Sequence, residues 1–348
     1  MSTMENLRKL ATGTETKIFD PRDPLNASAG AELLDASVVK RGEQWWMFLA
    51  GQASGYGATD LFSASLPAGV PLSANGWKLI RDSAGALLPV AGRGRSSAWD
   101  GEGGRHCPSY VKGWDAHRGE WVERIYYAGA AENLWGPYTI GFLQWDGEKW
   151  VDEPKPAFTA NEEWEHGSVY EPNLLFHNGK WKMWYVAGSN AENYLVQGYV
   201  ESGDGRTGWS KHEIFAPPEI KMFDFCVRQR GDSFHAIFAR VWVSEGTPPI
   251  ETGLWWCGSK TPSATLSDWG PPVQIMPAED RGWHAGPWKP SLEFDEQRED
   301  RALVFFDGSY RTSDPGPFPF AFSLGCFEID LPPAAVPRTH GRTLSEST

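Results

Sequence analysis

Short apolar runs, each ended by a polar turn, recur along the whole chain. The stretches LLDASVVKRGEQWWMFLAG from Leu33 and YEPNLLFHNGKWKMWYVAG from Tyr170 both have the pattern strand, polar turn, strand. Their turns, RGE at 41–43 and NGK at 178–180, contain residues that favour tight hairpins. Helical periodicity is nowhere sustained beyond short pieces. The pattern predicts an all-β protein.

The hairpin pattern occurs five times. Its copies lie around Leu33, His106, Tyr170, Phe223 and Trp288. A third apolar run follows each copy, and several copies have a fourth run that carries Trp, as in NGWKLI, DGEKWVDE and GWSKHEI. The first strands share one position, and we call its occupants the anchor residues: Asp35, Cys107, Glu171, Asp224 and Lys289. Successive anchor residues are 72, 64, 53 and 65 positions apart.

A repeat of this length is too long for one hairpin and suits a four-stranded unit. Five such units predict a five-bladed β-propeller, with four-stranded antiparallel blades around a central channel. We expect a single propeller domain over residues 20–330, an N-terminal extension over 1–19 and a polar C-terminal tail over 331–348. Either the segment near 17–21 or the final strand near 320–330 is expected to close the ring.

Composition and charge narrow the range of partners. The chain has 19 Trp, 38 Gly and 26 Pro, a combination typical of strands, many short turns, and pockets for sugars or apolar groups. Its net charge of -13 argues against nucleic acid or an anionic membrane as a partner, because either needs a basic surface. We therefore expect a small, neutral, sugar-like molecule. The oligomeric state is left open.

Targeting and redox signals are weak. The first residues lack the apolar core of a secretion signal, and no apolar run is long enough for a membrane helix, so we expect a cytoplasmic protein. The four cysteines stand singly without a CxxC pair. This predicts reduced, buried thiols rather than disulfides or a zinc site.

The inner strand of every propeller blade lines the central channel, so the anchor residues should meet at one mouth of it. Three of them, Asp35, Glu171 and Asp224, are carboxylates. Such residues often cap turns or pair with arginines. A cluster of like charges is unfavourable for stability, however, and perturbed carboxyl groups are typical of functional sites. We interpret the cluster as a candidate catalytic site.

The repeat and its acidic inner-strand positions resemble the five-bladed propeller glycosidases, the arabinanase, arabinofuranosidase and β-xylosidase group (glycoside hydrolase family 43-like) with its invertase-like cousins. LLDASVV is similar to the first-blade segment of that group, which implies that Asp35 is general base or nucleophile. The group has an Asp in the third blade and an acid Glu in the fourth, whereas this chain has Glu171 and Asp224, and Ala36 replaces the usual Pro. It is thus a divergent member by sequence. The assignment is Asp35 as base and Glu171 as acid, with Asp224 orienting the substrate; the alternative makes Asp224 the acid.

Other polar and aromatic residues near the inner strands are candidates for substrate binding. They are His106, His166, Trp164, Trp283, His284, Trp288 and Lys289. Lys289 is expected to neutralise an anionic substrate. The resemblance places His284 near a central calcium or sodium ion, although we expect no required cofactor and assign no metal ligand. The absence of an HxxxH pair argues against zinc.

Two classes of function fit these features. The first is a glycoside hydrolase that cleaves a small or exo-terminal glycoside at the acidic channel mouth, since glycosidases need two carboxyl groups of different pKa. The second is a propeller repurposed as a non-hydrolytic enzyme, such as a cyclase, lyase or isomerase, or as a binding module for a small cytoplasmic metabolite. A fold alone does not decide between them.

Overall fold

The structure is a computed structural model of the 348-residue chain. It describes residues 15–53, 58–72, 76–91, 99–189, 194–240, 252–296, 298–310 and 322–331. Of the predicted terminal segments, only residues 15–19 and Leu331 fall within these ranges. In this part of the chain the helices are three 3-10 turns: η1 (Glu163–Glu165), η3 (Pro218–Ile220) and η4 (Leu266–Asp268). None is long or apolar enough to cross a lipid bilayer.

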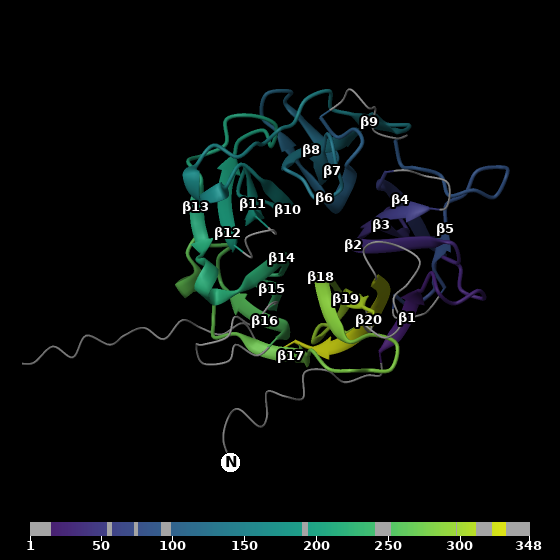
Figure 1. Ribbon diagram of the computed structural model, residues 1–348. Coiled ribbons are helices and arrows are strands. Elements are labelled where there is room, and N and C mark those ends of the chain that lie inside the picture. The colour runs from purple at the N-terminus through teal and green to yellow at the C-terminus, as the bar shows by residue number, and fades with distance from the viewer. Residues whose placement is uncertain are drawn as a thin grey trace, which may run out of the picture.

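The strands form five antiparallel four-stranded sheets arranged around a centre (Figure 1). Blade 1 contains β2 (Ala31–Arg41), β3 (Gln44–Ala53), β4 (Asp60–Leu66) and β5 (Lys78–Leu79). Blade 2 contains β6 (Gly104–Asp115), β7 (Glu120–Ala130), β8 (Tyr138–Trp145) and β9 (Trp150–Asp152). Blade 3 contains β10 (Val169–His177), β11 (Lys180–Ser189), β12 (Tyr194–Ser202) and β13 (Glu213–Ala216). In each, strands run in chain order from the centre outward.

Blade 4 repeats this order, and blade 5 closes the ring. Blade 4 contains β14 (Met222–Arg230), β15 (Ser233–Arg240), β16 (Gly253–Ser259) and β17 (Val273–Pro277). Blade 5 contains β18 (Gly286–Phe294), β19 (Arg301–Ser309), β20 (Phe322–Asp330) and, outermost, the N-terminal strand β1 (Thr16–Phe19). The predicted five-bladed propeller is confirmed, and the early segment closes the ring by pairing with the final strand.

Side chains from neighbouring blades pack against each other to form the core. In one cluster, Met47 and Leu49 of blade 1 are buried together with Phe305 and Leu324 of blade 5. Each sheet is covered on both faces by its neighbours, which explains why its strands are apolar on both faces. The propeller therefore holds its inner strands in fixed positions around the channel.

Hydrogen bonds between inner strands align the blades. The residue two positions after an anchor residue accepts a backbone N–H from the next blade in three cases: Ser37 from Tyr110 at 2.9 Å, Ser109 from Leu174 at 3.2 Å, and Asn173 from Val227 at 3.3 Å. These bonds fix the height of one inner strand relative to the next, and so fix the relative positions of the anchor residues.

Candidate active site

Every anchor residue lies at an irregularity in its inner strand. The pairing register shifts next to all five, as expected for β-bulges. All five also have a left-handed backbone: Asp35 (φ 58°), Cys107 (56°), Glu171 (52°), Asp224 (58°) and Lys289 (35°). This conformation costs a non-glycine residue roughly 1–2 kcal/mol. Strain repeated at the same place in all five blades is typical of a functional site.

The bulge changes which side chains face the channel mouth. Consecutive side chains of a regular strand point to opposite faces. Here both Leu34 and Asp35 line one pocket, and so do both Tyr170 and Glu171. The bulge therefore lets each of these inner strands present two neighbouring side chains to the pocket.

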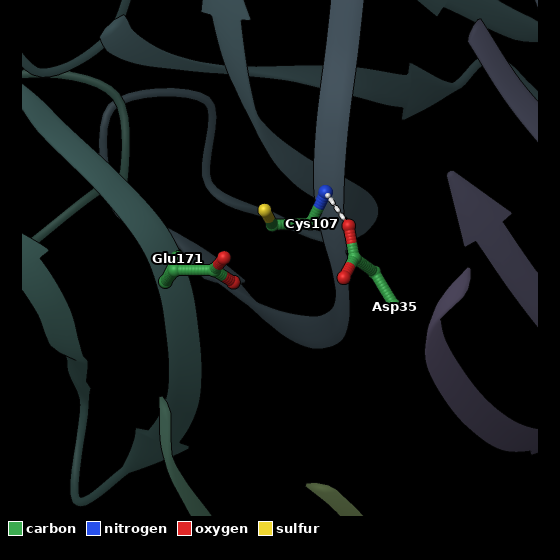
Figure 2. A group of neighbouring side chains, drawn as sticks. All are labelled: Asp35, Cys107 and Glu171. Carbon is green, nitrogen blue, oxygen red and sulfur yellow. Dashed lines mark hydrogen bonds between the residues drawn. The ribbon is translucent and has the colours of Figure 1, made fainter. Parts of the chain in front are cut away.

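The carboxyl groups of Asp35 and Glu171 point toward each other, with the thiol of Cys107 beside them (Figure 2). An oxygen of each carboxyl group and the sulfur of Cys107 all lie within 4.8 Å of one another. The backbone N–H of Cys107 donates to Asp35 Oδ2 at 3.0 Å. All three side chains are buried and line the pocket. The carboxyl groups from blades 1 and 3 thus lie close together at the channel mouth, as the repeat predicts.

Lys289 brings a positive charge into this cluster. Its ammonium group is hydrogen-bonded to Glu171 Oε2 and lies 3.3 Å from Asp224 Oδ1. Lys289, Glu171 and Asp224 are all buried. Neither Asp224 nor Lys289 is among the residues that line the pocket. Both side chains lie behind Glu171, and the positive charge of Lys289 also lowers the pKa of Asp35.

A fourth carboxyl group, that of Asp307, supports Asp35. The backbone N–H of Asp35 donates to Asp307 Oδ1 at 3.2 Å and to Oδ2 at 2.9 Å. Asp307 lies on β19, opposite Trp288 of β18, and is fully buried. The sequence analysis did not identify it. A signal was present in the repeat, because Ala50, Ala128, Val186 and Ala239 occupy the positions that correspond to Asp307 in the other blades.

Burial and neighbouring negative charges raise the pKa of Asp35, Asp224 and Asp307. Burial and the negative charge of Glu171 raise the pKa of Asp35 to about 6, against the opposing effects of Lys289 and the Cys107 N–H. Burial, together with Glu171, raises the pKa of Asp224 well above its usual range. Burial and the charge of Asp35 raise the pKa of Asp307 in the same way. Asp35 lines the pocket, and its pKa of about 6 lies close to neutral pH.

The pocket above these groups has a volume of about 500 Å³. Its walls are mostly aromatic or aliphatic. Every blade contributes the residue that directly precedes its anchor residue: Leu34, His106, Tyr170, Phe223 and Trp288. A concave site of this size with a few polar groups at one place is the usual form of a small-molecule site.

The structure brings some of the predicted binding residues to the pocket and places others elsewhere. His106 and Trp288 lie in its wall. Trp164 and His166 are not in the pocket lining. The ring of Trp164 stacks on that of Tyr185, with 6.3 Å between the ring centres, and His166 directly follows η1. Trp283 is also outside the lining.

The predicted cation site near His284 has a different environment. His284 is fully buried, and its Nε2 is 2.9 Å from Glu15 Oε2, outside the pocket lining. Within the described ranges, the ligand atoms that lie close enough together to share an ion belong to Asp35, Cys107 and Glu171. Calcium takes oxygen ligands, one of these groups is a thiol, and Lys289 already contacts Glu171. This donor set does not fit a central calcium ion.

No protein-family model matches the sequence, and no curated protein sequence matches it. Solved structures do match the fold. A glycoside hydrolase is 13% identical with a TM-score of 0.63, covering 97% of this chain and 100% of that chain. The catalytic domain of the Coprinopsis cinerea GH62 α-L-arabinofuranosidase is 10% identical with a TM-score of 0.59, covering 93% and 98%. A thermostable family-43 glycoside hydrolase is 12% identical with a TM-score of 0.57, covering 90% and 98%.

These likenesses define the class of fold. The chain is a five-bladed β-propeller of the kind found in arabinofuranosidases and family-43 glycoside hydrolases, and the resemblance inferred from the sequence is confirmed at the level of fold. At 10–13% identity the likeness does not extend to substrate or to the roles of individual residues.

Proposed function

We propose that the protein hydrolyses the glycosidic bond of a small or exo-terminal glycoside. The observation that carries this proposal is the pair of carboxyl groups, Asp35 and Glu171, which face each other at one pocket with oxygen atoms within 4.8 Å. Glycosidases use two carboxyl groups that flank the bond to be broken. A concave pocket of about 500 Å³ suits one terminal sugar better than the middle of a polymer.

The electrostatics favour the opposite division of roles from the assignment made from the sequence, in which Asp35 is the base and Glu171 the acid. The negative charge of Glu171 is among the causes that raise the pKa of Asp35 to about 6, which suits a group that gives and takes a proton. Lys289 contacts Glu171, and an ammonium group stabilises the negative charge of a carboxylate beside it. We therefore assign Asp35 as acid and base, and Glu171 as nucleophile.

The proposed reaction has two steps. In the first, Glu171 attacks the anomeric carbon, the bond to the leaving oxygen breaks, and Asp35 gives its proton to that oxygen. In the second, Asp35 takes a proton from water, the water oxygen attacks the anomeric carbon, and the bond to Glu171 breaks. The short separation supports this course, because carboxyl groups about 5 Å apart are typical of retaining enzymes and wider pairs of inverting ones.

A panel of 4-nitrophenyl glycosides tests the activity: α-L-arabinofuranoside, β-D-xyloside, β-D-fructofuranoside and β-D-galactoside. We expect turnover of at least one, with a first-formed product that keeps the anomeric configuration when followed by NMR. Turnover with inversion would contradict the two-step course. No turnover on an extended panel that also includes oligosaccharides would contradict the hydrolase proposal.

Two variants separate the roles. Glu171→Gln removes the nucleophile, so it should abolish turnover of activated and unactivated glycosides alike. Asp35→Asn should reduce turnover of poor leaving groups by about 10²–10⁴-fold and spare the first step with activated ones. Asp146→Asn, on an exposed turn, is the control carboxylate variant. The reverse pattern would restore Glu171 as the acid, with Asp35 as base.

One observation favours a second candidate, a sugar-binding module without turnover. The contact between Lys289 and Glu171 occupies one carboxyl oxygen, Oε2, of the group that would attack the anomeric carbon. In that case wild-type protein would bind glycosides with the affinity of the Glu171→Gln variant and convert none of them. Calorimetry on both proteins distinguishes this outcome from hydrolysis.

A further inference from the structure

Six aromatic rings form a continuous arc in the wall of the pocket. Successive ring centres are 5.5, 5.3, 6.4, 4.7 and 6.0 Å apart along the series His106, Tyr138, Tyr170, Phe223, Trp288 and Phe322. We call these residues the aromatic arc. They come from blades 2, 3, 4 and 5, and all of them line the pocket. The arc is therefore a shared surface of four blades.

Three polar groups in this part of the wall are engaged by backbone carbonyl groups. The hydroxyl of Tyr138 donates to the carbonyl of Leu134, and the hydroxyl of Ser309 donates to that of Gly286 at 3.0 Å. His106 Nε2 lies 2.9 Å from the carbonyl of Gly103, so it carries the hydrogen of that bond. A sugar ring against this wall would bury hydroxyl groups with few partners, at a cost of about 1–3 kcal/mol for each. The wall instead suits an apolar group.

The pocket is acidic rather than apolar where Asp35 and Glu171 meet. Their carboxyl groups are acceptors for the hydroxyl groups of one sugar ring. The pocket thus has an acidic part for one sugar and an apolar part for whatever that sugar is attached to. Its volume of about 500 Å³ is large enough for a ligand of a few rings.

Trp135 extends the apolar part outward. It lines the same pocket, yet its side chain is 61% exposed. Flat aromatic side chains at a pocket mouth favour stacking with a flat partner. An exposed Trp in the lining of the pocket is placed to stack on a flat ligand.

We infer that the substrate is a glycoside with an apolar, aromatic aglycone rather than an oligosaccharide. The sugar occupies the acidic part of the pocket, and the aglycone lies along the aromatic arc toward Trp135. This inference rests on the proposed hydrolysis for its account of turnover, but the binding preference follows from the pocket wall alone.

Matched pairs of substrates test the inference. Methanol and benzyl alcohol are similar leaving groups, so a difference between methyl and benzyl glycosides of one sugar reports contact with the aglycone. We expect kcat/KM for benzyl α-L-arabinofuranoside or benzyl β-D-xyloside to exceed that of the methyl glycoside by at least about tenfold, since burial of a phenyl group stabilises the complex. Xylobiose and arabinobiose should be the poorer substrates. Equal or better turnover of these disaccharides would overturn the inference.

Trp135→Ala should reduce kcat/KM for the benzyl glycoside about tenfold and change that of the methyl glycoside less than about twofold. Trp121→Ala is the matched control, because Trp121 is 58% exposed and lies in a separate hollow of blade 2. It should change neither value. Equal losses for both substrates in Trp135→Ala, or the same selective loss in Trp121→Ala, would contradict the assigned place of the aglycone.

A binding measurement separates this inference from the proposed function. Methyl and benzyl 1-thioglycosides of L-arabinofuranose and D-xylose are titrated calorimetrically into wild-type protein and Glu171→Gln. A benzyl preference of at least about tenfold without hydrolysis of any glycoside would leave the inference standing and defeat the proposed activity. Hydrolysis without a benzyl preference would do the opposite. Binding of neither thioglycoside would overturn the inference.

Discussion

The backbone N–H of Asp35 donates to both carboxyl oxygens of Asp307, at 3.2 and 2.9 Å. The two residues are 272 positions apart in the chain and belong to blades 1 and 5. Through this contact, the neighbouring blade stabilises the left-handed backbone conformation of Asp35. The position of one pocket carboxyl group therefore depends on correct closure of the ring.

Asp307→Asn should preserve this contact. The pKa of Asp307 is raised well above its usual range, which favours the neutral carboxyl group, and Asn has nearly the same shape. The amide oxygen can accept the N–H of Asp35. Asp307→Ala leaves that N–H unpaired and should lower the free energy of unfolding by about 1–3 kcal/mol. Chemical denaturation of the three proteins measures the difference, and equal losses in both variants would contradict the role.

The same pair gives a pH dependence of stability. The folded protein keeps the Asp307 proton that the unfolded chain releases above about pH 4, so stability from this group falls as pH rises above that value. Wild-type protein should therefore lose stability relative to Asp307→Asn between about pH 4 and neutral pH. Unfolding midpoints at several pH values measure this. A constant difference would show that Asp307 does not hold a proton in the folded state.

The catalytic pH profile tests the role of Asp35. Its pKa is about 6, and an acid must be protonated in the first step. We expect kcat/KM for glycosides with poor leaving groups to fall as pH rises through about 6. A profile that instead rises through about 6 would identify Asp35 as a base in that step.

Lys289→Met should shift the fall of kcat/KM to higher pH; we call this falling part of the pH profile the limb. The positive charge of Lys289 lowers the pKa of Asp35, so its removal raises that pKa. Lys289→Arg keeps the charge and is the matched control, in which the limb should stay near its wild-type position. A limb that does not move in Lys289→Met would show that the charge of Lys289 does not reach Asp35.

The four cysteines should be unreactive in the folded protein. Cys107, Cys226, Cys257 and Cys326 are buried free thiols. Burial raises the pKa of Cys107 well above its usual range, even though this thiol lies in the pocket wall. A disulfide-exchange reagent should titrate almost no thiol in native protein and four after unfolding. Fewer than four in freshly purified, unfolded protein would contradict the assignment.

The fold could be read from the sequence because its information is local and repeated. A hairpin with a polar turn specifies two paired strands, and five copies at similar spacing specify the ring. The meeting of Asp35 and Glu171 followed from their shared position in the repeat. Sequence spacing was sufficient here because residues at the same position of the inner strands lie close together around the channel of a propeller.

The chemistry of the site was harder to predict. Lys289 was expected to neutralise a substrate, whereas in the structure it contacts Glu171 and Asp224. Such a contact depends on the height of one blade relative to the others, which no single repeat encodes. The bulges were missed because their left-handed residues are not glycines. Asp307 was missed because it lies on a second strand, β19, whereas the repeat predicts only inner-strand residues at the channel mouth.

The pairing of β1 with β20 has a consequence for how the protein is made. Translation runs from the N-terminus, so β1 emerges early and cannot find its partner until β20, about 300 residues later, has left the ribosome. Blades 1 to 4 each consist of neighbouring chain segments and can form as they emerge, whereas the ring can be sealed only after β20 has emerged. The contact between Asp35 and Asp307 spans that last seam. The pocket can thus mature only after β20 has emerged, and a nascent chain without β20 has no complete site.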